Sequence, residues 1–195
     1  AYYGETATSC ALDKCVERVK EMISWDEKYP RKDMGNGKVR GVGLALAMQG
    51  SGISNVDTAA VTIKVNDDGF YSLIIGASDM GTGCDTILAQ MAADCLDCDM
   101  DQIIVHGVDT DVSTYDTGSY ASSTTYVTGM AVVKTCEVLK EKILKKGAQY
   151  ISCPKEEVEF DGKRVFHPES GKEISLKEIG NQVMCGNEEA LQASE

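Results

Sequence analysis

The chain has 195 residues, with 31 Asp and Glu against 19 Lys and Arg, which gives a formal net charge of −12. This acidic balance argues against a nucleic-acid partner, which would need a basic face, and the 43% hydrophobic and 26% charged content is typical of a globular protein rather than a disordered one. No apolar run approaches the ~20 residues of a membrane span and no signal peptide opens the chain, so we expect a soluble, cytoplasmic protein without a membrane partner. Because the chain begins with Ala1 and stops at Glu195, we expect a piece of a larger protein.

The first third of the chain predicts a helix followed by strands. Apolar residues recur at helical spacing over 11–24, and Ser9 is a possible cap for that helix. An apolar run with two glycines follows over 39–48, after a Gly-Asn-Gly turn. Two β-rich runs, 58–65 and 70–77, are joined by Asn-Asp-Asp-Gly, which predicts a hairpin.

The remainder alternates helices and strands. A helix is expected after Gly83 through about residue 96, a strand over 102–108, and a long helix that begins after a Ser- and Thr-rich segment and can end at Gly147. A small hairpin over 158–166 and a short helix from Ser175 complete the pattern. The sequence thus predicts an α+β fold, with a mixed β-sheet packed by two central helices. We divide it into a main portion, 1–150, and a hairpin-plus-helix extension, 151–195.

The eight cysteines suggest packing rather than a metal site or a disulfide framework. Cys84 and Cys95 share one predicted helix face with Leu88 and Met91, where cysteine acts as a small hydrophobic residue. Cys95 and Cys98 also form a lone CxxC pair, so a zinc or redox protein remains an alternative that metal analysis would test.

The first candidate ligand site is the turn that contains Gly81, Thr82 and Gly83, between a strand and a helix. Glycines in such a turn allow backbone N–H groups to point at a ligand, and the helix N-terminus adds about half a positive charge. The spacing matches neither a Walker loop nor a dinucleotide fingerprint. An ordinary strand-to-helix turn is the alternative.

The second candidate site is the segment Tyr-Ala-Ser-Ser-Thr-Thr over 120–125, at the start of the long helix. Its consecutive hydroxyls lie beside first-turn N–H groups, which have no partner within a helix, and together they could hold an anion or a polar ligand. Ala121 is the one small apolar member and would allow close approach. The alternative is a series of ordinary Ser and Thr helix caps.

Taken in order, these segments resemble the molybdenum-binding subunit of the xanthine dehydrogenase and aldehyde oxidase family, the molybdenum hydroxylases. The resemblance covers about 10–146, and 147–195 fit the less distinctive extension of the family's domain. The matching motifs are Gly41-Val42-Gly43, Gly50-Ser51-Gly52, Asp68-Gly69, Met80-Gly81-Thr82-Gly83 with Thr86 and Gln90, Val108-Asp109-Thr110, Tyr120-Ala121-Ser122-Ser123-Thr124, Gly129 and Ala131-Val132.

The resemblance implies a cofactor and its contacts. In the family, the two helix-start segments hold the pterin of a molybdenum cofactor. Carried over by position, the contacts would be Gly81, Thr82 and Gly83 on one side and Ser122, Ser123 and Thr124 on the other, with Ala121 facing the metal. The pterin dithiolene binds the molybdenum, so no protein side chain is expected as a metal ligand. The cofactor is expected as molybdenum-molybdopterin, with a cytosine dinucleotide as one option.

Departures from the family limit what is expected of the chain by itself. Thr82 stands where the family has Gln, Tyr120 stands where xanthine-type members often have a small residue, and the Gly-Phe-Gly-Gly cofactor loop is absent. The family's catalytic Glu, in a Gly-x-Gly-Glu segment, has no counterpart, so the isolated chain should be inactive.

The function implied by the resemblance is that of an oxidoreductase fragment. The complete enzyme would hydroxylate a purine, another N-heterocycle or an aldehyde, with water as the oxygen source. The expected partners are the rest of the molybdenum subunit and subunits or domains that carry FAD and 2Fe-2S clusters. The hydroxyl-rich segment resembles the selenium-dependent purine and nicotinate hydroxylase branch. The alternative function is a non-catalytic ligand-binding or assembly module that uses the same two segments.

Overall fold

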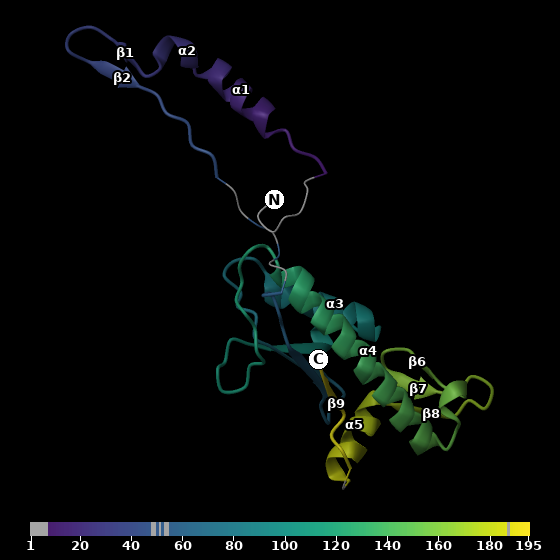
Figure 1. The fold of residues 1–195 in the computed structure, drawn as a ribbon. Coiled ribbons are helices and arrows are strands. Elements are labelled where there is room, and N and C mark those ends of the chain that lie inside the picture. Colours follow the sequence, from purple (N-terminus) through teal and green to yellow (C-terminus); the bar gives the residue numbers. More distant parts are fainter. Residues whose placement is uncertain (1–7, 48–49, 51, 53–54, 187) are drawn as a thin grey trace. The chain divides into compact units, whose positions relative to one another are not determined.

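The chain forms two compact units in this computed structural model, Ala1–Gly50 and Ser51–Glu195 (Figure 1). The structure describes residues 8–47, 50, 52, 55–186 and 188–195. The predicted Gly50-Ser51-Gly52 turn therefore falls partly outside the described residues. The predicted division near residue 150 stays a prediction, and residues 151–195 lie within the second unit.

The described residues of the first unit form two helices and a hairpin. Helix α1 (Leu12–Met22) confirms the predicted helix, and α2 (Trp25–Lys28) follows it. The expected Ser9 cap is wrong, because Ala11 occupies the N-cap position and no side chain caps the helix. Strands β1 (Arg31–Asp33) and β2 (Val39–Gly41) pair antiparallel around the predicted turn. Only these three residues of the apolar run over 39–48 form a strand among those described, and Met48 lies outside the described residues.

The second unit is built on a four-stranded mixed sheet in the order β5-β4-β3-β9. Strands β3 (Val61–Val65) and β4 (Tyr71–Ile75) form the predicted antiparallel hairpin, with Val65 opposite Tyr71. Strand β5 (Ile103–Gly107) runs parallel to β4, and helix α3 (Cys84–Leu96) connects the two. Strand β9 (Gln192–Ser194), which the sequence did not predict, extends the sheet antiparallel to β3.

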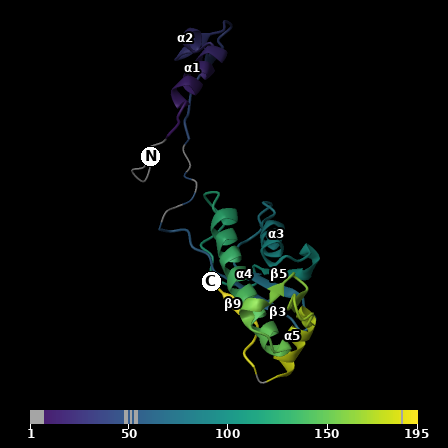
Figure 2. The same cartoon turned by 90° about the vertical axis from the view of Figure 1, so that its right-hand side faces the viewer.

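Helices α3 and α4 (Thr124–Ile151) lie side by side against this sheet (Figures 1 and 2). Alternate residues of β3 turn inward, and the fully buried side chains include Ile63, Leu88 and Leu139. The predicted α+β class, with a mixed sheet and two central helices, is confirmed. The predicted end of α4 at Gly147 is wrong, since the helix continues to Ile151. Gly147 instead permits close packing: a Cβ there would lie 2.5 Å from the Cβ of Val165.

The final third adds a small sheet and a capped helix. Strands β6 (Glu159–Phe160) and β7 (Arg164–Phe166) form the predicted hairpin, and β8 (Glu173–Ser175) adds a third strand. Helix α5 (Leu176–Cys185) begins after Ser175 as predicted, with a capping box in which Ser175 and Glu178 bond to each other's backbone N–H. Short 3-10 segments occupy Met100–Gln102 and Lys155–Glu157.

The cysteines on the predicted α3 face pack as hydrophobic residues. Cys84 is 2% exposed, and Met91 and Cys95 are partly buried against the core. Burial raises the pKa of Cys98 to about 11 and also raises that of Cys95, so both thiols are protonated near neutral pH. In the described part of the chain, no helix is both long enough and apolar enough to cross a membrane.

Candidate functional site

Both predicted ligand segments belong to loops that leave the same edge of the sheet. Strands β4 and β5 run parallel, so the loops that follow them, 76–83 and 108–123, start at their shared carboxyl end. This edge is where open α/β sheets commonly bind ligands. The topology therefore brings to one side of the domain two segments that lie about forty residues apart in sequence.

The second loop crosses the strand ends closely enough to require a glycine below it. A Cβ on Gly76 would lie 2.2 Å from the carbonyl oxygen of Thr114 and 2.9 Å from Cβ of Asp116. The Thr114 hydroxyl donates to the carbonyl of Ala60 at 2.5 Å, and the Ala60 N–H donates to the carbonyl of Tyr115 at 2.9 Å. One side-chain and one backbone hydrogen bond thus hold the loop to Ala60, the residue that precedes β3.

Side-chain hydrogen bonds then connect the loop to α4 and to the glycine turn. The Asp116 carboxylate accepts from the Gly118 N–H at 2.8 Å and from the Thr128 hydroxyl of α4 at 3.2 Å. The Ser119 hydroxyl donates to the carbonyl of Ser78 at 2.9 Å, which joins the loops that carry the two predicted segments.

The glycine turn has the predicted conformation but a different hydrogen-bond pattern. Gly81 and Gly83 have φ of 101° and 74°, and Gly83 is the N-cap residue of α3. Their N–H groups donate to Oδ1 of Asp79 at 2.8 and 3.1 Å, and these bonds lower the pKa of that carboxyl. The expectation that these two N–H groups point at a ligand is wrong, because a carboxylate of the same turn already accepts from both.

The other side of the turn is open. Apart from the adjoining residues of the chain, no heavy atom of the described residues lies within 4 Å of the position that a Cβ would take on Gly81 or Gly83. The Thr82 side chain is exposed. A flat ligand can therefore approach this backbone closely.

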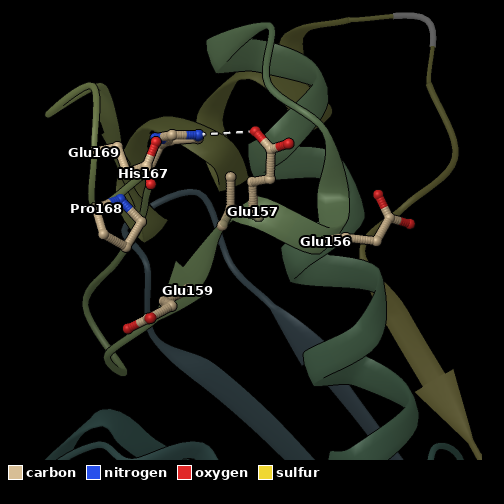
Figure 3. A pocket seen from close by; sticks show the side chains of 7 residues that line it. Glu156, Glu157, Glu159, His167, Pro168 and Glu169 are labelled. Carbon is tan, nitrogen blue, oxygen red and sulfur yellow. Dashed lines mark hydrogen bonds and ion pairs between the residues drawn. The ribbon is translucent and has the colours of Figure 1, made fainter.

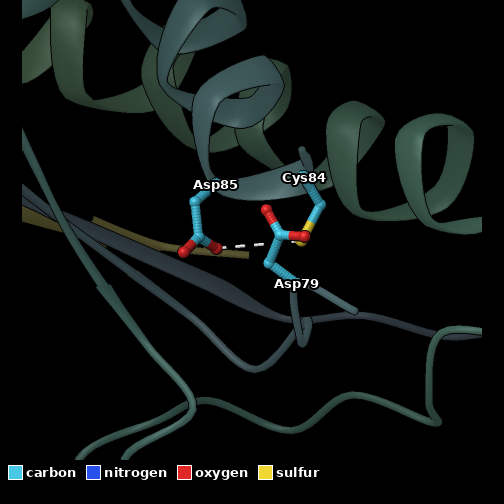
Figure 4. A group of neighbouring side chains, drawn as sticks. All are labelled: Asp79, Cys84 and Asp85. Carbon is cyan, nitrogen blue, oxygen red and sulfur yellow. Dashed lines mark hydrogen bonds between the residues drawn. The ribbon is translucent and has the colours of Figure 1, made fainter. Parts of the chain in front are cut away.

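An acidic group that sequence reasoning missed lies beside the turn. Ligand atoms of Asp79, Cys84 and Asp85 lie within 4.8 Å of one another (Figure 4). Burial, then the charges of Asp85 and Asp79, raise the pKa of the Cys84 thiol, which donates to Asp85 at 3.7 Å. The signal was available, since all three residues fall within seven positions around the two glycines. The group makes the turn locally negative.

The hydroxyl segment forms a second turn before α4. Ala121 and Ser122 both have left-handed backbone, with φ of 50° and 55°, and the Gly52 N–H donates to the carbonyl of Ala121 at 2.7 Å. Ser123 is 6% exposed, and its hydroxyl donates back to the carbonyl of Tyr120 at 2.9 Å. The Ser122 side chain is exposed.

The start of α4 is not capped in the ordinary way. Ser123 occupies the N-cap position, but no side-chain hydrogen bond caps the helix there. The alternative of a Ser or Thr cap is therefore wrong for this residue. The Ser123 N–H donates to the carbonyl of Tyr120 at 3.2 Å. The N-terminus of α4 that follows carries partial positive charge, which suits an anion.

The same two loops expose apolar side chains. Met80 and Tyr115 are each 69% exposed, and Val108, a β-branched residue with φ of 48°, is 58% exposed. Ligand-binding surfaces often combine polar groups with exposed apolar side chains, and these two loops carry both. Val108 belongs to one of the motifs that carry the family resemblance, but the resemblance assigned it no contact with the cofactor.

A pocket elsewhere in the second unit contains none of the predicted residues. It has a volume of about 400 Å³ and is lined by Glu156, Glu157, Val158, Glu159, His167, Pro168 and Glu169 (Figure 3). The Ser170 N–H donates to Nδ1 of His167, so Nε2 carries the ring proton and donates to Glu157 at 3.0 Å. This histidine is satisfied structurally, and the pocket adds no group to the site.

Comparison with known proteins identifies the family to which most of this chain is similar. Residues 18–195 match the family model described as molybdopterin cofactor-binding domain. The chain is 37% identical over 181 residues to the probable hypoxanthine oxidase XdhD of Escherichia coli K12, a match that covers 93% of this chain. It is 30% identical over 149 residues, 74% of this chain, to the xanthine dehydrogenase molybdenum-binding subunit of Escherichia coli O157:H7.

Solved structures share the fold. CO dehydrogenase from Oligotropha carboxidovorans superposes with a TM-score of 0.64 at 23% identity over 71% of this chain, and 18% of its own. Quinoline 2-oxidoreductase from Pseudomonas putida 86 gives a TM-score of 0.60 at 18% identity, over 71% of this chain and 19% of its own. The chain spans about a fifth of the curated relatives, 18% and 20% of their lengths.

Proposed function

Because this chain belongs to the molybdopterin cofactor-binding domain family of the molybdenum hydroxylases, we propose that its two loop segments at the carboxyl edge of β4 and β5 hold the pterin cofactor. The observation that carries the proposal is the hydrogen bond that joins the two loops. The Ser119–Ser78 hydrogen bond links loops that the topology brings to one edge of the sheet. The contacts we propose are Gly81, Thr82, Gly83, Ala121, Ser122, Ser123 and Thr124.

The glycine turn fits the pterin ring better than it fits a phosphate. The N–H groups of Gly81 and Gly83 are already bonded to Asp79, and Asp79 and Asp85 make this surface negative. A pterin ring presents amino and amide N–H donors, which the exposed carboxylate of Asp79 can accept. The open space above Gly81 and Gly83 admits the flat ring.

The turn over 120–124 suits the phosphate end of the cofactor. Its left-handed backbone at Ala121 and Ser122 leads into the N-terminus of α4, which carries partial positive charge. The exposed Ser122 hydroxyl can donate to a phosphate oxygen, whereas the buried Ser123 hydroxyl holds the turn through Tyr120. The Ser123 N–H also donates to the carbonyl of Tyr120, at 3.2 Å, so Ser123 would shape the turn that meets the cofactor.

The complete protein would be an oxidoreductase that hydroxylates a purine, another N-heterocycle or an aldehyde with oxygen from water. When bound, the molybdenum cofactor supplies the two-electron oxidation. The residues of this chain bind and orient the pterin. The catalytic Glu, the FAD and the 2Fe-2S clusters would reside in other parts of the subunit or on partners, in the cytoplasm. The similarity to a protein named for hypoxanthine oxidation supports a purine substrate. Neither a cytosine dinucleotide tail nor selenium is part of this proposal.

The experiment is cofactor retention by paired variants of the complete subunit. We expect Ser122→Ala to reduce bound pterin, measured by fluorescence of its oxidised form, and molybdenum, measured by mass spectrometry, at least tenfold. Thr125→Ala is the matched control, because Thr125 is an exposed hydroxyl residue in the first turn of the same helix outside the proposed contacts. It should leave both contents unchanged.

Two results would contradict the proposal. Equal pterin content in the two variants would remove Ser122 from the site. A wild-type subunit that folds with an intact circular dichroism spectrum and holds no pterin would favour the non-catalytic binding or assembly module.

A further inference from the structure

Asp116 is the residue at which the loop over 108–123 is fixed to both the sheet and α4. Its backbone forms an antiparallel bridge with Ala59, just before β3. Its Cβ packs so closely on Gly76, at the end of β4, that a Cβ on that glycine would lie 2.9 Å away. On the other side, its carboxylate accepts from the hydroxyl of Thr128 in α4 at 3.2 Å, and Thr128 is only 1% exposed.

A series of local hydrogen bonds leads from Asp116 to the hydroxyl segment. The carboxylate accepts from the Gly118 N–H at 2.8 Å, and the Gly118 carbonyl accepts from the Tyr120 N–H at 3.1 Å. The Tyr120 carbonyl in turn accepts from the N–H and the hydroxyl of Ser123, at 3.2 and 2.9 Å. The two left-handed residues between Tyr120 and Ser123 therefore depend for their position on where Asp116 is held.

The same turn also makes the connection to the glycine turn. Ser119, whose hydroxyl donates to the carbonyl of Ser78 at 2.9 Å, directly follows the Gly118 that Asp116 holds. Gly118 has φ of 122°, and a Cβ there would lie 3.2 Å from the ring of Tyr120, so this turn requires a glycine. One carboxylate thus sets the position of both the hydroxyl segment and the bond that joins the two loops.

We propose that Asp116 is a positioning residue for the cofactor: it holds the loop so that the segments 81–83 and 120–124 meet the pterin together. Asp116 acts through Gly118 and Thr128 rather than by touching the pterin, because its Oδ1 already accepts from the first and its Oδ2 from the second. This inference rests on the proposed function, since it takes the two segments to be the pterin contacts.

Pterin retention by the complete molybdenum-binding subunit tests the inference. Asp116→Ala removes both side-chain hydrogen bonds and should lower bound pterin, measured by fluorescence of its oxidised form, at least tenfold. Asp116→Asn should keep at least half of the wild-type content, because its amide can accept from the Gly118 N–H and donate to the Thr128 hydroxyl. Asp111→Ala, which replaces an exposed acid of the same loop, is the matched control and should leave the content unchanged.

Two further measurements separate positioning from a general loss of stability. In subunits produced in a host that makes no molybdopterin, the amides of 117–124 should exchange hydrogen at least tenfold faster in Asp116→Ala than in the wild type. Ile143→Val, which truncates a fully buried side chain further along α4, should lower the urea midpoint but keep the wild-type pterin content. If Asp116→Ala does not fold, Thr128→Val should lower the content at least threefold, whereas Thr128→Ser, which keeps the hydroxyl, should not.

Three outcomes would overturn the inference. Wild-type pterin content in Asp116→Ala would show that the segments need no such anchor. An equal loss in Asp116→Asn would assign the effect to the charge, and an equal loss in Ile143→Val would assign it to stability alone. A wild-type subunit that holds no pterin would count against the proposed function. The exchange of 117–124 in the cofactor-free samples would then still decide whether Asp116 fixes the segment.

Discussion

Both units of this chain contain helices with apolar residues at helical spacing, but they differ in how deeply those residues are buried. In Ser51–Glu195, the helices and strands bury a continuous core that includes Ile63, Leu88 and Leu139. In Ala1–Gly50, helix α1 also has apolar residues at helical spacing, but none of its residues is fully buried. The contrast shows that amphipathic spacing predicts which face of an element is apolar, but not how fully that face is buried within its own unit.

The largest difference between the units should appear in their response to truncation of an apolar side chain. Ile63 is fully buried in β3, at the centre of the sheet and below α4. Ile63→Ala should lower the free energy of unfolding of the chain by about 2–5 kcal/mol, because it removes buried methyl groups and leaves a cavity. Urea denaturation followed by circular dichroism measures this change.

Lys64→Ala is the control on the same strand, since the Lys64 side chain points to solvent. Its effect should stay within about 0.5 kcal/mol. A similar loss for both variants would mean that the strand, rather than the buried side chain, responds to substitution.

The sequence predicted elements where local chemistry decides the structure. The Asn-Asp-Asp-Gly turn produced the β3–β4 hairpin, with Gly69 at φ of 86°, and Ser175 caps α5. The sequence did not predict the features that depend on contacts between residues far apart in the chain. Strand β9 has three residues and exists through its pairing with β3, and Gly147 is explained by Val165, which is eighteen positions away.

The candidate site illustrates the same limit. The sequence identified both glycine and hydroxyl turns, and the parallel pairing of β4 and β5 brings their loops to one edge. The two glycines indicated N–H groups that could bind a ligand. A neighbouring carboxylate, however, accepts hydrogen bonds from the same N–H groups. Asp79 precedes the turn by two positions and takes the N–H groups of Gly81 and Gly83. The short spacing of Asp79 from both glycines was the signal that an Asx-type turn would form.

A smaller loss of stability is expected when the cap of α5 is removed. This helix sharpens the comparison between the units, because both a local cap and buried side chains stabilise it. Ser175→Ala should cost about 1 kcal/mol at neutral pH, since the Ser175 hydroxyl accepts from the Glu178 N–H. Hydrogen bonds from the Ser175 hydroxyl and N–H also lower the pKa of Glu178. A lowered pKa contributes stability above the unfolded pKa, and this contribution is lost as the pH falls through the folded value.

The difference between wild type and Ser175→Ala should therefore shrink as the pH falls below the ordinary Glu value of 4.5. Part of the difference does not depend on pH, because in the wild type the Glu178 N–H donates to the Ser175 hydroxyl whether or not the Glu178 carboxyl is protonated. Urea titrations at a series of pH values measure both parts. A difference that grows on acidification would contradict the assigned role of Glu178.

The smallest effect is expected in the first unit, and it tests the contrast most directly. Val19→Ala removes methyl groups from one of the apolar residues of α1, but Val19 is 40% exposed and α1 has no buried residue. In the chain of 195 residues, the free energy of unfolding should change by less than about 0.5 kcal/mol, measured by the same urea titration as for Ile63→Ala. A loss as large as that of a core truncation would mean that α1 unfolds together with the core, which requires its apolar side chains to be buried within this chain. The absence of an effect here, combined with a loss of several kcal/mol at Ile63, would show that the apolar side chains of α1 add little to the stability of this chain.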